Sequence, residues 1–339
     1  YRTSNYLTAS DFAGNYQIPG TMNNANLRPE IVSSWEVGLD LRMFRNRLGV
    51  DLAYYNNTSK DLIVNMPVSS ASGVTKRFAN AGTIRNYGWE LQINGTLVKT
   101  RDVQWKVYVN WSKNRNEVVD LGEGVDSWIV ASYSSHAYMT AYKGGSLSAM
   151  YGLGYKRAPE GAYIVEKDGS ITNVSGQIIV DENGYPQYSD ELQYIGECTP
   201  DWKGGFGTSV KWKGLTVSVA FDGQHGGNVY SYTNAVLGTR GKGSFTLAGR
   251  YDGLVLDGVN QLPDGNFIRN THKTADIVEY YGLAYAFQNC EQNFVSTEFL
   301  KLREIRIAYE FPRQLLARSK FNKGLSLSVY GRNLYCWSK

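Results

Sequence analysis

The chain has 339 residues, which is enough for one large β domain or two domains of ordinary size. Apolar residues make up 42% and charged residues 19% of the chain, so a disordered chain is excluded. The formal net charge of +4 is small, and no basic run is interleaved with aromatic residues, which argues against a nucleic-acid partner.

Apolar and polar residues alternate with a period of two along much of the chain. In the first such run, Trp35, Val37, Leu39 and Leu41 alternate with polar residues or glycine. This alternation puts the apolar side chains of a strand on one face. We therefore expect antiparallel neighbours of a single sheet near residues 30–43, 48–58, 86–98, 103–116, 201–212, 215–226, 298–311 and 324–335.

One of these runs changes its phase. Leu300 and Leu302 lie on one parity, whereas Ile305, Ile307 and Tyr309 lie on the other. An extra residue in a strand shifts the parity of everything after it, so the pattern predicts a β-bulge near the middle of the run.

The lengths of the runs separate two kinds of all-β protein. Strands of soluble sandwiches usually have about five or six residues, whereas tilted membrane strands need about 9–11. Several runs reach the longer figure. The 25 Tyr and 8 Trp also suit strands and a membrane-water interface, and aromatic residues gather near the run ends at Trp35, Tyr87, Trp89, Trp111, Trp202 and Trp212.

The connections alternate between short and long. Tight turns are expected at 44–47, 99–102 and 213–214, and long loops at 64–86, 117–200 and 228–296. Outer-membrane barrels have brief periplasmic turns and extended external loops. We therefore expect all the short connections at one end, together with 312–323, in which residues 313–318 favour a helical turn after Pro312.

Two loop segments carry turn signals. Residues 167–170, with Asp168-Gly169, and residues 182–185, with Asn183-Gly184, predict β-turns. Strands that rise above the membrane are therefore expected within 150–180. The acidic residues at 181–182 also suggest a calcium loop, but the acidic residue that should end such a loop is missing, so the turn is favoured.

The sequence lacks the residue patterns of common catalytic and metal sites. His136, His225 and His272 are isolated, and no nucleophile elbow, P-loop or zinc motif is present. Glu36, Asp40, Asp51 and Glu90 are better explained as residues facing a wet lumen or a plug. We therefore expect no enzyme, no catalytic residue, no metal and no cofactor.

The three cysteines, Cys198, Cys290 and Cys336, are an odd number and are widely spaced. They therefore cannot form a fully paired framework, although one Cys198–Cys290 bridge is possible. No stretch approaches the ~20 apolar residues of a spanning helix. The first residues are neither a methionine nor a signal peptide, so we expect the chain to be part of a longer protein.

Aromatic residues in the long loop at 117–200 are the candidates for contact with a substrate or a partner. Exposed Tyr and Trp are favoured contact residues, although each of these side chains can equally be packed among loop strands. The candidates are Trp128, Tyr133, Tyr138, Tyr142, Tyr151 and Tyr155.

Three stretches of the chain resemble a known family. Residues 26–30 with 35–40 resemble the NLxPE…WExGxD strand of TonB-dependent receptors. Residues 194–206, continuing to 221–227, resemble the IGxxxPDWxGGF…FDxxxGG hairpin of SusC-like and RagA-like importers, and residues 299–305 with 329–335 resemble their FLKLRxI…VxGxNLxxW strands. The three occur in the family's order and span nearly the whole chain.

The resemblance implies an antiparallel transmembrane β-barrel of the bacterial outer membrane, with about 22 strands closed around a plug. It implies import of oligosaccharides or peptides, energy from the TonB complex and a SusD-like surface lipoprotein that covers the barrel, with no nucleic acid involved. Residues 1–339 would be the C-terminal part of that barrel, contributing roughly eight strands. The plug, the TonB box, the earlier strands and the final strand would lie outside this sequence.

Two other functions fit the alternation. A soluble or cell-surface β-sandwich for glycan binding or adhesion would bury the same apolar faces against each other. A receptor for a siderophore or vitamin would have the same barrel, but the motifs at 200–206 and 221–227 favour the SusC-like type.

Overall fold

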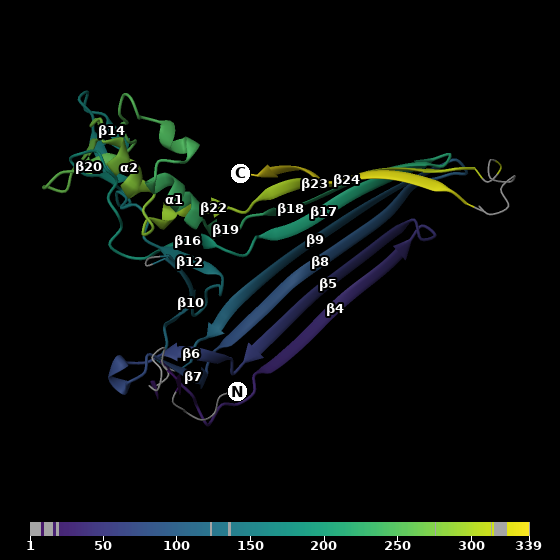
Figure 1. Cartoon of the computed structure of the whole chain (residues 1–339), viewed down its shortest axis with the longest axis horizontal. Coiled ribbons are helices and arrows are strands. Elements are labelled where there is room, and N and C mark those ends of the chain that lie inside the picture. Colours follow the sequence, from purple (N-terminus) through teal and green to yellow (C-terminus); the bar gives the residue numbers. More distant parts are fainter. Residues whose placement is uncertain are drawn as a thin grey trace.

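The computed structural model describes residues 8–9, 16–17, 20–122, 124–134, 137–274, 276–312, 314 and 324–338. One eight-stranded antiparallel sheet dominates the molecule, and its strands follow each other in chain order (Figure 1). It contains β4 (Ile31–Met43), β5 (Leu48–Lys60), β8 (Thr83–Lys99), β9 (Val103–Asp120), β17 (Trp202–Trp212), β18 (Leu215–His225), β23 (Phe299–Glu310) and β24 (Ser326–Ser338). The predicted single sheet is confirmed, and β4 and β24 are its two edges.

The short connections lie at one end of this sheet, as predicted. The Thr96 N–H donates to the Arg47 carbonyl oxygen (2.7 Å), which joins the β4–β5 turn to β8. The Lys213 N–H donates to the Asp102 carbonyl oxygen (3.0 Å), and the Glu310 N–H donates to the Gly214 carbonyl oxygen (2.9 Å). Each turn is therefore tied to its neighbour. The helical turn predicted at 313–318 falls on residues that lie almost entirely outside the described ones.

The Lys213–Gly214 turn shows how the sequence sets a connection. Both residues have positive φ values, 44° and 93°. Two positive φ values are the geometry of a type I′ hairpin turn, whose twist matches the twist of the paired strands. Glycine is needed at the second position, where a Cβ would lie 2.7 Å from the Glu310 carbonyl oxygen.

The register aligns apolar side chains across all eight strands. One row of directly paired residues runs through Leu41, Val50, Ile93, Val109, Phe206, Phe221, Leu302 and Tyr335. Each strand contributes one apolar residue to it. Because successive side chains point to opposite faces, the neighbouring positions form rows of the other face.

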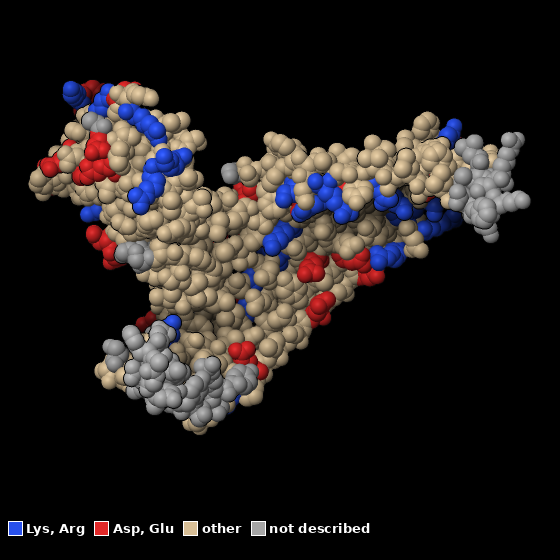
Figure 2. Space-filling view, in the orientation of Figure 1, with Lys and Arg blue, Asp and Glu red and all other residues tan. Residues whose placement is uncertain are grey.

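The neighbouring rows are polar. One runs through Asp40, Asp51, Gln92, Asn110, Gly205, Asp222, Lys301 and Cys336. Figure 2 shows acidic and basic side chains spread along one face of the long sheet. The sheet thus has one apolar face and one charged face.

The predicted β-bulge is present in β23 at Arg303. Leu302 pairs with Phe221 and Glu304 with Ala220, so Arg303 is the extra residue. The bulge places Arg303 and Glu304 on the charged face, where Arg303 pairs with Asp222 (2.5 Å) and Glu304 with Arg332 (2.8 Å). Solvent screens these partly exposed pairs, so they orient side chains more than they stabilise the fold.

The alternative of a β-sandwich is wrong. In a sandwich a second sheet would cover the apolar face. Here Val37 is 64%, Ile307 51% and Val329 71% exposed. No second sheet packs on that face among the described residues. In these residues no helix is long and apolar enough to cross a membrane.

Smaller elements lie at the loop end of the sheet (Figure 1). The segment between β5 and β8 forms β6 (Ile63–Pro67), η1 (Ser70–Ser72) and β7 (Lys76–Asn80), which pairs in parallel with β3 (Thr21–Met22). Nearer the N-terminus, β1 (Thr8–Ala9) pairs with β2 (Tyr16–Gln17).

Residues 117–200 and 228–296 fold together into what we call the loop module. The first loop contains β10 (Ser127–Ser134), β11 (Ala137–Tyr142), β12 (Ala149–Gly152), β13 (Tyr163–Val165), β14 (Ile171–Asn173), β15 (Ile179–Val180) and β16 (Gln193–Glu197). The second contains β19 (Asn228–Tyr230), α1 (Tyr232–Thr239), η2 (Ser244–Leu247), β20 (Val259–Gln261), β21 (Phe267–Arg269), α2 (Ile277–Ala284), α3 (Cys290–Asn293) and β22 (Phe294–Ser296). The strands predicted within 150–180 are confirmed.

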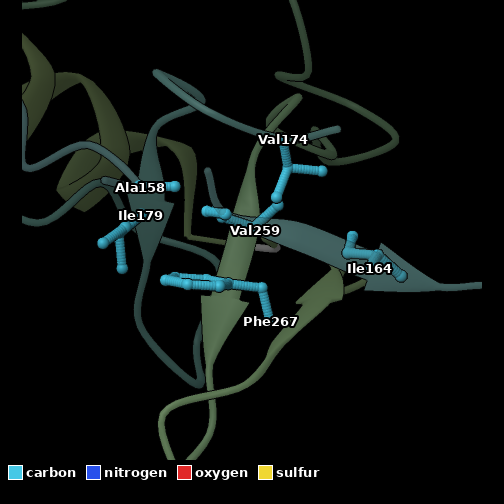
Figure 3. Packing of buried hydrophobic residues seen from close by; sticks show 7 residues of the cluster. Ala158, Ile164, Val174, Ile179, Val259 and Phe267 are labelled. Carbon is cyan, nitrogen blue, oxygen red and sulfur yellow. The ribbon is translucent and has the colours of Figure 1, made fainter. Parts of the chain in front are cut away.

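The two loops share one hydrophobic core. Val174 and Ile179 from the first loop pack with Val259 and Phe267 from the second (Figure 3). Strands β15 and β20 pair in parallel, which joins the loops by backbone hydrogen bonds as well. Arg157 forms an ion pair with Glu291, so a charged contact also crosses between them.

The turns predicted in the module are confirmed. Residues 166–170 close the β13–β14 hairpin, with Gly169 at a φ of 86°. Asp181 accepts hydrogen bonds from the Asn183 and Tyr185 N–H groups through Oδ1 (2.9 Å each), and Gly184 has a φ of 80°. The Asp181 carboxylate thus stabilises the turn by accepting these two backbone hydrogen bonds.

Residues 228–296 were expected only as a long loop, whereas their described part contains three α-helices. The N-cap side chains Ser231 and Asp276 accept hydrogen bonds from the N–H groups of Asn234 (3.1 Å) and Glu279 (2.9 Å). Asp276 with Glu279 is a capping-box spacing that sequence alone could have revealed. Helices this short are marginal by themselves and depend on packing, here of Ile277, Tyr280 and Ala284.

The phenols of Tyr188, which is partly buried, and Tyr280, which is buried, stabilise the module in a pH-dependent way. The Tyr188 hydroxyl donates to the Leu283 carbonyl oxygen, across the two loops. Burial raises the pKa of Tyr188 to about 12, and burial beside the phenols of Tyr281 and Tyr285 raises the pKa of Tyr280 to about 12. An unfolded tyrosine ionises near pH ~10. The stabilisation linked to these protons is therefore complete below pH ~10 and is lost as pH rises toward 12.

We expect Tyr188→Phe to reduce by one the number of phenols that ionise near pH 12. The measurement is an ultraviolet absorbance titration of the folded protein. Tyr163→Phe, at an exposed position of the β13 hairpin, is the matched control and should leave that step unchanged. Equal titration curves for Tyr188→Phe and the unaltered protein would contradict the assignment.

The two faces of β18 should differ in what they contact. Val217 and Val219 lie on the apolar face and Ser218 on the charged face. In a protein otherwise free of cysteine and held in membranes, cysteines at 217 and 219 should react with a lipid-soluble maleimide and resist a charged one. A cysteine at 218 should show the reverse preference. Protection of 217 and 219 from both reagents would show that protein covers this face.

Candidate binding site

Two of the six aromatic candidates belong to the core of the loop module. Trp128 is 9% exposed and packs with Val118 and Leu121, with its ring against Gly82. Tyr155 is 3% exposed, and its burial raises its pKa. For Trp128 and Tyr155 the structure thus favours packing among loop strands over contact with a ligand.

Three tyrosines form a row on the sheet β10–β11–β12–β16. The ring centroids of Tyr142 and Tyr151 are 4.9 Å apart, and those of Tyr151 and Tyr194 are 5.7 Å apart. Tyr142 is 37% and Tyr194 56% exposed. We call these three residues the tyrosine row. Burial, followed by the charges nearby, raises the pKa of Tyr151 and of Tyr194, so both phenols remain hydrogen-bond donors at neutral pH.

The other two candidates lie on the same sheet. Tyr138 pairs directly with Tyr151 across β11 and β12 and is partly exposed. Tyr133 is 37% exposed and stacks on Tyr230 with centroids 6.3 Å apart. The structure therefore gathers Tyr133, Tyr138, Tyr142 and Tyr151 on one four-stranded sheet.

A polar pocket opens where β9 and β17 part. Their last direct pair is Ser112 with Lys203, and β9 continues beyond it to Asp120. The pocket has a volume of about 320 Å³ and is lined by Asn114, Arg115, Asn116, Ser146, Ser148, Tyr194, Glu197, Thr199 and Asp201. We call it the mouth pocket.

Hydrogen bonds hold the walls of the mouth pocket in place. Asn116 Oδ1 accepts from the Leu147 N–H (2.6 Å), and the Ser148 hydroxyl donates to Glu197 Oε2 (2.7 Å). The Tyr194 hydroxyl donates to Glu197 Oε1 (3.3 Å). Glu197 therefore connects the pocket with the tyrosine row.

Sequence reasoning missed Tyr194 and Glu197 as site residues. Tyr194 begins the 194–206 motif and Glu197 follows Gly196 within it. That motif indicated a family and no binding role for either residue. Tyr194 is exposed on β16. The three rings become neighbours only because Tyr151 of β12 pairs with Tyr194 of β16.

The carboxylates expected to face a lumen or a plug lie on the charged face of the sheet. Asp40, Asp51 and Glu90 line a hollow of about 890 Å³ together with Lys203 and Asp222. Arg42 bridges Asp40 and Asp51 at 3.2 Å each. Glu36 lies on the same parity of β4. This arrangement gives a hydrated, charged wall.

The described residues contain no group of His, Cys, Asp and Glu that could hold a metal ion. Cys198 and Cys336 are free thiols, so a Cys198–Cys290 bridge is not formed. His136 lies outside the described residues, whereas His225 contacts Glu298 at the end of β18.

Comparisons with known proteins agree with this architecture. The model of the family described as TonB dependent receptor-like, beta-barrel matches residues 1–253. TonB-dependent receptor P3 of Formosa agariphila is 25% identical over 348 residues, which covers 98% of this chain and 33% of that protein. TonB-dependent receptor SusC of Bacteroides thetaiotaomicron is 30% identical over 105 residues, 31% of this chain and 10% of that protein.

A solved structure shows the same fold. The structure of the RagAB peptide transporter matches with a TM-score of 0.70 and 20% identity, covering 100% of this chain and 35% of that chain. The chain spans about a third of the length of the first curated relatives it matches. The two-faced meander, the sorted loops and the family match together lead to one conclusion: the chain belongs to the TonB-dependent receptor β-barrel family of the outer membrane and resembles its SusC-like members.

Proposed function

We propose that the protein imports oligosaccharides or peptides across the outer membrane, driven by the TonB complex and assisted by a SusD-like surface lipoprotein. The observation that carries the proposal is the concentration of polar and aromatic binding groups at the loop end of a two-faced sheet. The similarity to SusC and to the RagAB peptide transporter supports it.

In this proposal residues 1–339 form the C-terminal part of the barrel. Two observations support this: among the described residues β4 and β24 each pair with a single strand, and the chain spans about a third of the length of its relatives. The plug with its TonB box, the earlier strands and the final strand would then come from the remainder of the protein. The charged face of the sheet would enclose the plug.

The tyrosine row and the mouth pocket suit an extended polar substrate. Aromatic rings pack against the apolar face of a sugar ring or against peptide side chains. The pocket beside them offers amide, hydroxyl, carboxylate and guanidinium groups, so it can both donate and accept hydrogen bonds. An oligosaccharide or a peptide presents both kinds of surface along its length.

An exposed patch on the loop module suits the lipoprotein. Val278 is 82%, Leu247 61% and Tyr251 102% exposed. A groove of about 980 Å³ in this region is lined by residues of α1, of α2 and of the segment between them, which contributes Arg240 and Arg250. Figure 2 shows Lys and Arg on this module. An apolar patch with a polar rim is the usual composition of a protein-protein contact.

Removing the central ring of the tyrosine row should weaken substrate binding. We expect Tyr151→Ala to lower the affinity roughly tenfold, because an aromatic ring that the substrate would cover is lost. Tyr151→Phe should retain most of the affinity, and Tyr163→Ala, an exposed tyrosine of the β13 hairpin, should be neutral. The measurement is binding and uptake of the oligosaccharide or peptide that supports growth. Equal affinity for Tyr151→Ala and Tyr163→Ala would refute the site.

A charge placed in the exposed patch should release the lipoprotein. Val278→Glu is expected to reduce its co-purification with the transporter about tenfold or more, because a carboxylate would be desolvated in the contact. Ile171→Glu, on the β14 strand of the same module and 70% exposed, is the control. Loss of the lipoprotein in both variants, or in neither, would disprove this placement of the contact.

A further inference from the structure

The apolar face of the sheet is interrupted by a groove near its loop end. On the same face, two residues closer to the loop end than the fully apolar row, the next row runs through Leu39, Leu52, Leu91, Trp111, Gly204, Gly223, Leu300 and Trp337. Glycine occupies this row in β17 and β18, whereas the six other strands carry a large apolar side chain. The two glycines thus leave a gap between Trp111 and Leu300.

The groove is a shallow, open hollow in the apolar face. Its volume is about 560 Å³, and Val109, Trp111, Leu300 and Trp337 are among the residues that line it. Phe206 also lines it, and the Phe206 ring stacks on that of Phe221 with centroids 4.9 Å apart. The volume lies within the range of about 300–1,000 Å³ that is usual for small-molecule sites.

The upper end of the groove is polar. Trp202 stacks on His225 with centroids 5.8 Å apart, and His225 contacts the carboxylate of Glu298. Asp201 directly precedes Trp202 in the chain and forms an ion pair with Arg115 (2.5 Å). Tryptophan and mixed charges at the end of an apolar strand face mark the membrane-water interface. The groove therefore begins at the interface and descends along the apolar face.

Close approach of the strands explains only one of the two glycines. A Cβ at Gly223 would lie 2.4 Å from the Phe299 carbonyl oxygen, so this position requires glycine for backbone packing. A Cβ at Gly204 would lie 3.1 Å from the Asn110 carbonyl oxygen and 3.5 Å from the Trp202 ring. The neighbours would have to move by a few tenths of an ångström to accept that atom. Backbone packing is therefore a weaker constraint at Gly204 than at Gly223.

We propose that this groove binds one acyl chain of a membrane lipid of the outer leaflet, with the lipid head group at His225 and Glu298. The groove is continuous with the face that an outer-membrane barrel turns toward lipid. It is apolar along its length and polar at the interfacial end, which matches the order of tail and head in a lipid. A chain seated there would be held between aromatic rings and would exchange more slowly than lipid on the remainder of the face.

The first test uses the intact protein without substitution. The protein, in membranes, is exposed to a lipid with a photoreactive diazirine in its acyl chain, and labelled peptides are mapped by mass spectrometry. We expect labelling of residues 109–111, 202–206 and 337 several-fold above that of the apolar positions in 215–219. Uniform labelling along the apolar face, or cross-links to a second protein in place of lipid, would overturn the proposal.

The second test fills the groove. Gly204→Leu should lower the amount of lipid retained after exhaustive detergent exchange at least fivefold, as quantified by mass spectrometry. Val210→Leu adds bulk on the same face of the same strand, outside the groove, and should retain lipid like the unaltered protein. A heat-dependent shift in gel mobility verifies that both variants are folded. Equal lipid retention in the two folded variants would refute the site.

Discussion

The backbone hydrogen-bond ladder of the eight-stranded sheet is the constraint on which the remainder of the structure depends. In hydrocarbon each unpaired backbone group would cost several kcal/mol, so strands that cross a membrane must pair with neighbours along their whole length. This pairing fixes the register, and the register places Phe206 beside Phe221 and Val109. A shift by one residue would turn the apolar row to the charged face.

The bulge at Arg303 illustrates how strictly this constraint acts. Without the extra residue, Ile305 and Ile307 would lie on the charged face, because Leu300 and Leu302 fix the opposite parity. The strand accommodates both sets of residues by leaving Arg303 out of the pairing. The bulge also brings two successive charged residues to the charged face, where Asp222 pairs with Arg303 and Arg332 pairs with Glu304.

Above the membrane the physical requirement changes. Loops in water can leave backbone groups to the solvent, so they fold only where side chains bury enough apolar surface. The loop module does so by combining segments that are about 80 residues apart, such as Ile179 and Val259. Its rigidity positions the tyrosine row and the mouth pocket. The exposed rings of Tyr142 and Tyr194 are therefore held in defined positions by the folded module.

The sequence alone determined the sheet. Alternation with a period of two revealed the eight strands, the bulge and the two faces, because side-chain direction in a strand follows directly from position. The glycine-containing turns were equally local, since Lys213–Gly214 and Asn183–Gly184 need no partner to be recognised.

Only the tertiary structure decided which loop aromatics are available. Trp128, Tyr155 and Tyr151 occur in similar local surroundings, yet two are buried and one belongs to an exposed row, because their environments are supplied by residues far along the chain. The short helices were missed for the same reason, since their stability comes from packing within the module. The mouth pocket and the groove depend on the register between strands that are distant in the chain, such as β9 and β17, and no local pattern of residues fixes that register.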